Sequence, residues 1–123
     1  EIMVTVGGSE AIDVAMRAML NPGDEVITFA PYFGEYRSYV NNFDGVLVEI
    51  SPNTVDFQPK LDEFEQKITP KTKAVIVNNP NNPTGVVYSE ETIKKLAAIM
   101  EAKQKLLRSW QQFLRKNSRN LEV

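Results

Sequence analysis

Residues 78–85 read NNPNNPTG, and this stretch decides how the chain is interpreted. It directly follows TKAVIV (72–77), an apolar run that is typical of a buried strand. Each proline restricts its own backbone and that of the residue before it, and the bond before a proline is where a cis peptide occurs. Asparagine amides both donate and accept hydrogen bonds. The stretch therefore predicts a rigid loop that presents amides to a polar ligand, and a rigid loop without function is the weaker alternative.

Strands and helices alternate along the rest of the chain. Short apolar runs predict strands, and apolar residues at helical spacing predict helices. The alternation favours an α/β fold with a mainly parallel sheet and flanking helices. The expected strands are 2–6, 25–30, 45–50 and 72–77, and the expected helices are 10–20, 31–42, 61–68 and a long C-terminal helix from about 89 to about 116.

Two further loops follow expected strands, and parallel strands gather ligands at their carboxyl ends. GGS (7–9) stands before the first helix, where a helix N-terminus suits a phosphate and where Ser9 equally suits a capping role. APYF (30–33) places Tyr32 and Phe33 where an aromatic ring can stack on a flat ligand. Taken alone, these rings are better explained as packing between helix and sheet. Three such loops on one edge indicate one site.

Composition excludes several classes of chemistry. The 123 residues include no cysteine and no histidine, so a disulfide framework and a Ser-His-Asp triad are impossible and a zinc site is not expected. No apolar run approaches the roughly 20 residues that span a bilayer, and no signal peptide is visible. These features predict a cytoplasmic protein without a membrane partner.

Charge is distributed unevenly. Residues 1–101 carry 8 Lys/Arg and 15 Asp/Glu, which gives −7, whereas residues 102–123 carry 6 Lys/Arg and 1 Glu, which gives +5. A basic tail can contact nucleic acid, but no nucleic-acid-binding motif accompanies it. We therefore expect no nucleic-acid partner and interpret the tail as a solvated amphipathic helix.

Together the motifs resemble the large domain of fold-type-I pyridoxal-phosphate aminotransferases, in the aspartate-aminotransferase-like class I/II group. The resemblance covers about residues 1–105 and rests on VGGSEAI, NPGDEVI, APYFGEY, KAVIVNNPNNPTG and SEETIKKLA, in the order and spacing of that family. It implies a cofactor, pyridoxal 5′-phosphate. Gly8 and Ser9 would hold its phosphate, Phe33 would stack on its ring and Asn82 would hydrogen-bond its phenolic oxygen. The bonds before Pro83 and Pro31 are candidate cis peptides.

The resemblance also implies what lies beyond the matched residues. The family's pyridine-pairing aspartate, its Schiff-base lysine and its substrate-binding arginine all fall later in the chain. Lys94, Lys95, Lys103 and Lys105 lie on the last expected helix, outside that lysine's motif. We therefore expect a fragment of an aminotransferase that is inactive alone, does not bind the cofactor alone, and belongs to a parent enzyme acting on an amino acid.

Residues 106–123 depart from the family pattern and form a divergent basic amphipathic tail that continues the last helix. Leu106, Trp110 and Phe113 follow helical spacing, and a frameshift or an engineered junction would explain such an unrelated end. Since a truncated sheet exposes edges and apolar surface, we expect a homo-oligomer.

Two alternatives to the aminotransferase fragment stay open. One is a non-catalytic oligomerising or regulatory domain with the same fold. The other is a nucleotide-binding domain, which is weaker because GGSEAI lacks the glycine spacing of a dinucleotide loop.

Overall fold

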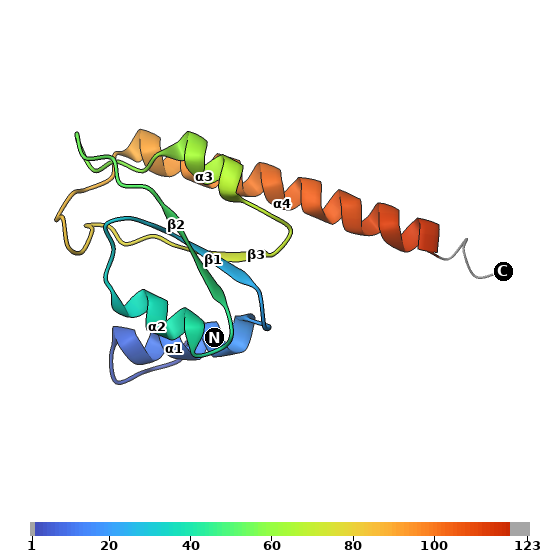
Figure 1. The fold of residues 1–123 in the computed structure, drawn as a ribbon, viewed down its shortest axis with the longest axis horizontal. Helices are drawn as coiled ribbons and strands as arrows, with labels where there is room; N and C mark the ends of the chain where they lie inside the picture. The colour runs from blue at the N-terminus through green and yellow to red at the C-terminus, as the bar shows by residue number, and fades with distance from the viewer. Residues whose placement is uncertain (1, 119–123) are drawn as a thin grey trace. The chain divides into compact units, whose positions relative to one another are not determined.

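The computed structural model describes the backbone of residues 2–118 and the side chains of residues 2–104 (Figure 1). Two compact units follow one another, residues 1–88 and residues 89–123, and each is described by itself. The expected division at residue 105 concerns family resemblance and stays a prediction.

The first unit is built on a three-stranded parallel sheet. Its strands are β1 (Glu25–Phe29), β2 (Val46–Ile50) and β3 (Thr72–Ile76), in the order β2-β1-β3. Both neighbours of β1 run parallel to it. The helices are α1 (Gly8–Met19), α2 (Glu35–Asn41) and α3 (Leu61–Lys67). The predicted α/β class, the parallel sheet and these three strands are therefore confirmed.

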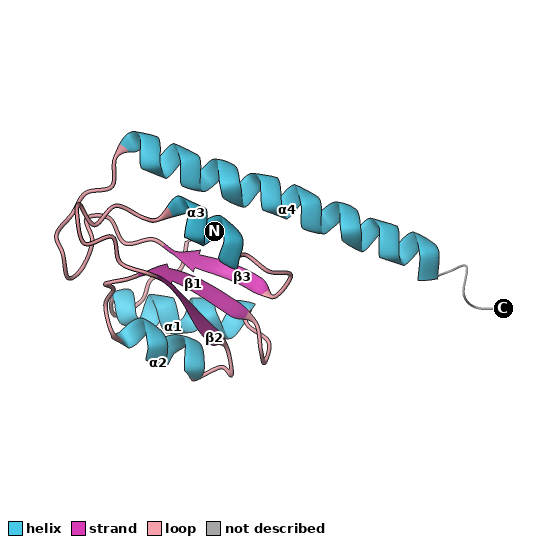
Figure 2. Ribbon diagram, turned by 45° about the horizontal axis from the view of Figure 1, so that its top comes forward, coloured by secondary structure: helices cyan, strands magenta, loops and turns pink. Residues whose placement is uncertain are grey.

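Helices cover both faces of the sheet. Figure 2 shows α1 and α2 side by side on one face and α3 on the other. On the first face, Met16 of α1 and Val40 of α2 form a buried cluster with Val26 of β1. On the other, the rings of Phe29 and Phe64 lie 5.4 Å apart, centroid to centroid. Because β1 is central and covered on both sides, its run EVITF is continuously apolar apart from the buried Thr28 and the terminal Glu25.

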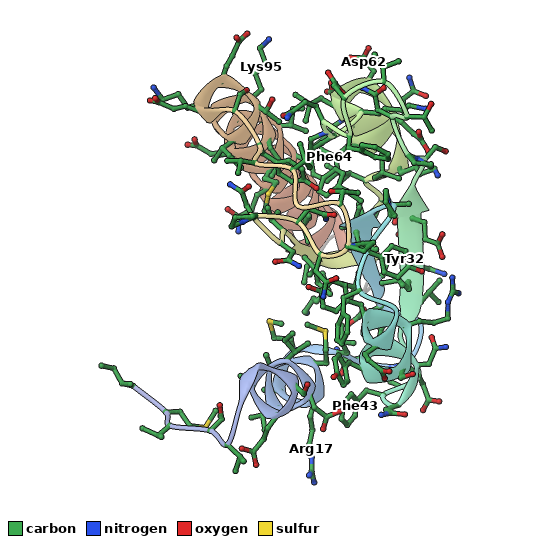
Figure 3. All side chains as sticks on the ribbon, turned by 90° about the vertical axis from the view of Figure 1, so that its left-hand side faces the viewer. Arg17, Tyr32, Phe43, Asp62, Phe64 and Lys95 are labelled. Atoms are coloured by element: carbon green, nitrogen blue, oxygen red, sulfur yellow. The ribbon has the colours of Figure 1, made fainter. Side chains whose placement is uncertain are left out.

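The strand predicted at residues 2–6 does not form. These residues are irregular, and the side chains of Ile2, Val4 and Val6 are at least 92% exposed. Figure 3 shows this segment leading away from the helices and the sheet. A strand requires a hydrogen-bonding neighbour, and no other segment of the described residues pairs with it. The apolar, β-branched composition indicated a strand but could not supply that partner.

The second unit consists of α4 (Glu90–Ser118), which is 29 residues long. Its amino end is capped by Ser89, whose Oγ accepts a hydrogen bond from the Thr92 N–H at 3.0 Å. Glu90 and Glu91 pair with the lysines four residues later, with N–O distances of 2.5 and 2.6 Å. The predicted long C-terminal helix is confirmed, while the apolar stripe predicted at 106–114 lies outside the residues whose side chains are described. Within residues 2–118, no helix has the length and apolar character needed to cross a bilayer.

Gly45 is fixed by packing at the start of β2. A Cβ at this position would lie 2.9 Å from Leu20 Cδ1, 2.9 Å from Val40 Cγ1 and 3.0 Å from the Val40 carbonyl oxygen. Because one of these contacts is backbone, Gly45→Ala should lower the free energy of unfolding by roughly 1–3 kcal/mol, measured by urea denaturation. Gly34→Ala is the matched control, since its Cβ would meet nothing within 4 Å, and an equal loss in both variants would contradict the packing argument.

Glu63 ties the segment after β2 to α3. Its Oε1 accepts hydrogen bonds from the Ser51 N–H at 3.0 Å and the Ser51 hydroxyl at 2.9 Å, and it lies 2.8 Å from Lys67 Nζ. The Lys67 ammonium and the Ser51 N–H lower the pKa of this carboxyl to about 2. A carboxyl group whose pKa is lowered by folding stabilises the folded state fully at pH values above its unfolded pKa, here about 4.5. That stabilisation is lost as the pH falls through the folded pKa of about 2.

We therefore expect Glu63→Gln to lower the free energy of unfolding by about 1 kcal/mol at pH 7 and by progressively less between pH 4.5 and pH 2. Urea denaturation across this range measures the effect. The control is Asp62→Asn, a neighbouring carboxylate without a hydrogen bond in the described residues, which should change stability by less than about 0.5 kcal/mol. A loss in Glu63→Gln that is constant with pH would contradict this assignment.

Candidate functional site

Two of the predicted site loops leave the same edge of the sheet. Thr28 of β1 pairs with Ile76 of β3, so the two parallel strands end level with each other. Phe33 follows the carboxyl end of β1, and Asn82 follows that of β3. The structure therefore places the predicted aromatic and the predicted amide at one edge, where open α/β sheets bind ligands.

The third loop reaches this edge because α1 runs opposite to the strands. The turn after α1 lies at the amino edge of the sheet, where the Gly23 N–H donates to the Asp44 carbonyl at 2.8 Å. The amino end of α1 therefore lies at the carboxyl edge, and Figure 1 shows it on the same side as the loops after β1 and β3. Gly8 and Ser9, in the first turn of α1, thus join Phe33 and Asn82 on one side of the unit.

The start of α1 is open. Gly7 is the N-cap and no side chain caps the helix, so the alternative in which Ser9 serves as the cap is wrong. Ser9 instead lies exposed in the first turn, where the backbone N–H groups have no partner within the helix. A Cβ added at Gly7 or Gly8 would meet nothing within 4 Å. These groups suit an anion such as a phosphate.

One negative charge already occupies this region. Glu10 Oε2 accepts a hydrogen bond from the Val6 N–H at 2.6 Å, reaching back over the start of the helix. The arrangement is similar to a capping box, in which a carboxylate in the first turn stabilises the helix. The same carboxylate would repel a second anion at the N–H groups of the first turn.

The loop after β1 carries a group of aromatic rings. Ala30–Pro31 is cis, as predicted, and the Ala30 N–H donates to the Ile50 carbonyl at 2.9 Å. Tyr36 of α2 is buried, and Tyr32 stacks on it at 6.2 Å between centroids, so the Tyr32 ring packs against the helix. Phe33 is half-buried and contacts Tyr36 edge-on at 5.7 Å, which leaves part of its ring uncovered.

A polar cluster that the sequence did not indicate holds this loop. The Tyr32 hydroxyl donates to Glu49 Oε1 at 2.7 Å, and Arg37 contacts both Tyr32 and Glu49. Burial raises the pKa of the Tyr32 phenol, and its hydrogen bond to Glu49 adds to the increase. The cluster joins the loop after β1, helix α2 and strand β2, so it fixes the backbone next to Phe33.

The NNPNNPTG stretch divides its asparagines into two kinds. Asn79 Oδ1 accepts a hydrogen bond from the Tyr88 N–H at 2.9 Å, and Asn81 Oδ1 accepts one from the Thr84 hydroxyl at 2.8 Å. Asn82 is exposed and its amide, like that of Asn78, has no hydrogen bond within the described residues. The bond before Pro83 is cis as predicted, and so is that before Pro80. The loop is thus held by two amides and leaves the amide of Asn82 available to a ligand.

Groups suited to other chemistry are sparse. In the part of the chain that the structure describes, no cluster of three or more Asp or Glu residues could hold a metal ion. Lys94 and Lys95 are engaged in ion pairs on α4, and Lys67 donates to the Glu49 carbonyl at 2.6 Å as well as contacting Glu63.

Comparisons with known proteins agree with this geometry. Residues 1–108 match the family described as aminotransferase class I and II. A probable aspartate/prephenate aminotransferase of Thermus aquaticus is 48% identical over 98 residues, which cover 79% of this chain and 26% of the relative. The aspartate aminotransferase of Sulfurisphaera tokodaii is 41% identical over 112 residues, which cover 89% of this chain and 28% of the relative.

A solved structure shows the same agreement in three dimensions. The amino transferase of Eubacterium rectale superimposes with a TM-score of 0.81 at 45% identity, covering 84% of this chain and 26% of that one. The chain thus spans about a quarter of the length of the relatives that it matches.

Proposed function

Because this chain belongs to the class I and II aminotransferase family, we propose that it forms part of the pyridoxal 5′-phosphate site of an enzyme that transfers amino groups between an amino acid and a 2-oxo acid. The observation that supports this most is the convergence of three loops, after β1, after β3 and before α1, on one edge of the sheet.

Each loop would serve a different part of the cofactor. The N–H groups of Gly8 and Ser9 and the Ser9 hydroxyl would bind the phosphate, because a helix N-terminus carries partial positive charge. The uncovered part of the Phe33 ring would stack on the pyridine ring. The free amide of Asn82 would donate a hydrogen bond to the phenolic oxygen.

The described residues would supply contacts that bind the cofactor, but none of them is an evident catalytic group for amino-group transfer. The cofactor carries the electron-withdrawing chemistry of amino-group transfer, whereas the protein supplies the lysine and the orientation. Lys94 and Lys95 are paired on α4 and outside the loops. We therefore propose that residues 1–108 bind and orient the cofactor in a longer parent enzyme and do not catalyse the reaction alone.

Pyridoxine 5′-phosphate tests the binding role, because it has the ring, the phenolic oxygen and the phosphate but no aldehyde. We expect weak, millimolar binding, with NMR shifts concentrated at Gly8, Ser9, Phe33 and Asn82. Asn82→Ala should weaken this binding by about fivefold, the loss expected for one hydrogen bond. Glu10→Gln should strengthen it by removing the neighbouring negative charge.

The matched control is Asn53→Ala, an asparagine in the segment after β2. Shifts scattered over the surface, or an equal effect of Asn53→Ala and Asn82→Ala, would overturn the proposed site. With pyridoxal phosphate itself, a stable absorbance change that depends on one lysine would overturn the proposal that the chain is inactive alone.

We also propose that the chain forms a homo-oligomer. The outer edges of β2 and β3 have no strand neighbour within the described residues, and the apolar segment 2–6 is exposed. Exposed edges and apolar segments of this kind favour association.

Light scattering coupled to size exclusion should give a mass of at least twice 13.9 kDa at micromolar concentration. Val4→Glu should shift the chain toward monomer, because it places a charge in the exposed segment. Val55→Glu is the control, since Val55 is 91% exposed but lies outside that segment. A monomeric unmodified chain would rule out this proposal.

A further inference from the structure

The ring of Phe33 lies at the end of an array of three aromatic rings, which the loop after β1 and helix α2 share. Tyr32 stacks on Tyr36 at 6.2 Å between centroids, with 10° between the ring planes. Tyr36 in turn meets Phe33 edge-on, at 5.7 Å and 79°. Only 6% of Tyr36 is exposed, so packing holds its ring, and it presents a fixed surface to Phe33.

A closed set of polar contacts holds the ring at the other end of this array, that of Tyr32. The Tyr32 hydroxyl donates to Glu49 Oε1 at 2.7 Å and accepts a hydrogen bond from Arg37 Nη2 at 3.0 Å. Arg37 also donates to the same carboxylate oxygen. Because the Tyr32 hydroxyl is both donor and acceptor, turning this ring away would break two hydrogen bonds at once.

Glu49 is a rigid anchor for these contacts. It lies in β2, where it pairs with Thr28 of the central strand. Its carbonyl accepts a hydrogen bond from Lys67 Nζ at 2.6 Å. The backbone from which the Glu49 side chain extends is therefore fixed both by the sheet and by α3.

These contacts are too exposed to act mainly on stability. The side chains of Arg37 and Glu49 are 56% and 39% exposed. An ion pair with this exposure adds little to the free energy of folding, because water screens it and two flexible side chains must be ordered to form it. The same contacts select one direction for the Tyr32 ring, so their larger effect is on the orientation of the three rings.

We propose that Tyr32 and Glu49 are positioning residues, which align the Tyr36 and Phe33 rings and so set the direction of the ring surface that Phe33 leaves uncovered. The ligand that this surface meets rests on the proposed function, whereas the alignment rests on the contacts alone. The Tyr36 N–H donates to the Phe33 carbonyl at 3.0 Å, so the backbone of Phe33 is held separately. Only the direction of its ring should therefore respond to changes at Tyr32.

Tyr32→Phe tests the alignment without a ligand, because it removes the hydroxyl and keeps the ring on Tyr36. In the free chain, the NMR signals of the Phe33 ring protons should move toward their random-coil positions. The loss of each hydrogen bond lowers the population of one side-chain direction by about fivefold. Tyr39→Phe is the matched control, because it removes from α2 a hydroxyl that has no hydrogen bond within the described residues.

Two variants of Glu49 separate its role as an acceptor from its charge. Glu49→Gln keeps an oxygen that can accept from the Tyr32 hydroxyl, so the Phe33 signals should stay close to those of the unmodified chain. Glu49→Ala removes the acceptor and should reproduce Tyr32→Phe, and it serves as the second variant if Tyr32→Phe does not fold. Equal movement of the Phe33 signals in Glu49→Gln and Glu49→Ala would overturn the role of Glu49 as the acceptor.

Binding of pyridoxine 5′-phosphate provides a readout that a purely structural role would not move. In Tyr32→Phe and in Glu49→Ala, the ligand-induced NMR shift of the Phe33 ring protons should fall about threefold, which is within the effect of one hydrogen bond. The ligand-induced shift of the Ser9 N–H should be retained, because the start of α1 takes no part in these contacts.

The outcomes separate the two proposals. Phe33 signals of the free chain that move no further in Tyr32→Phe and Glu49→Ala than in Tyr39→Phe overturn the alignment. Equal loss of the ligand-induced shifts of Phe33 and Ser9 overturns the positioning role. If the unmodified chain shows no ligand-induced shift at either residue, the proposed function fails, and the Phe33 signals of the free chain alone then support or overturn the alignment.

Discussion

The parallel pairing of β1 with both β2 and β3 is the constraint on which the rest of the structure depends. Parallel neighbours cannot be joined by tight hairpins, so each connection must cross back over a face of the sheet, here through α2 and α3. The crossovers bury β1 on both faces and return every strand in the same direction. As a result, the loops that follow β1 and β3 lie at the same edge of the sheet because of the strand direction alone.

At that edge, different asparagines of the loop after β3 hold the loop in place and face a possible ligand. Asn81, which is buried, and Asn79, which is exposed, use their amide oxygens to accept hydrogen bonds from Thr84 and Tyr88. Within the part of the chain that the structure describes, the Asn82 amide has no such partner. Ordering a loop costs conformational entropy at each residue that is fixed. Hydrogen bonds within the loop offset part of that cost. The hydrogen bonds of Asn79 and Asn81 hold the loop, so the neighbouring Asn82 amide can stay exposed on a fixed backbone.

The sequence predicted what depends on local pattern and missed what depends on distant partners. EVITF, GVLVEI and TKAVIV are continuous apolar runs, and each became a strand because its neighbours are strands of the same kind. IMVTV has the same composition but lacks a partner in the described residues, so it did not. The placement of Phe33 and Asn82 at one edge followed from their positions after expected strands. The Tyr88–Asn79 and Tyr32–Glu49 hydrogen bonds join residues 9 and 17 positions apart and leave no periodic signal.

The start of α1 shows that stabilising this unit and binding a ligand oppose each other. Glu10 stabilises the helix by placing a negative charge over its positive end and by accepting the Val6 N–H. A phosphate would use the same electrostatic attraction, so the two negative groups compete for it. The N–H groups of Gly8 and Ser9, which have no partner among the described residues, have an anion-binding geometry, but the Glu10 carboxylate already neutralises part of the positive potential there. In the proposed site, the phosphate end would therefore contribute less free energy than an uncapped helix N-terminus, and binding would draw more on the ring of Phe33 and the amide of Asn82. Recognition by the proposed site would thus depend more on the backbone that holds Asn82 than on the attraction of the helix end for the phosphate.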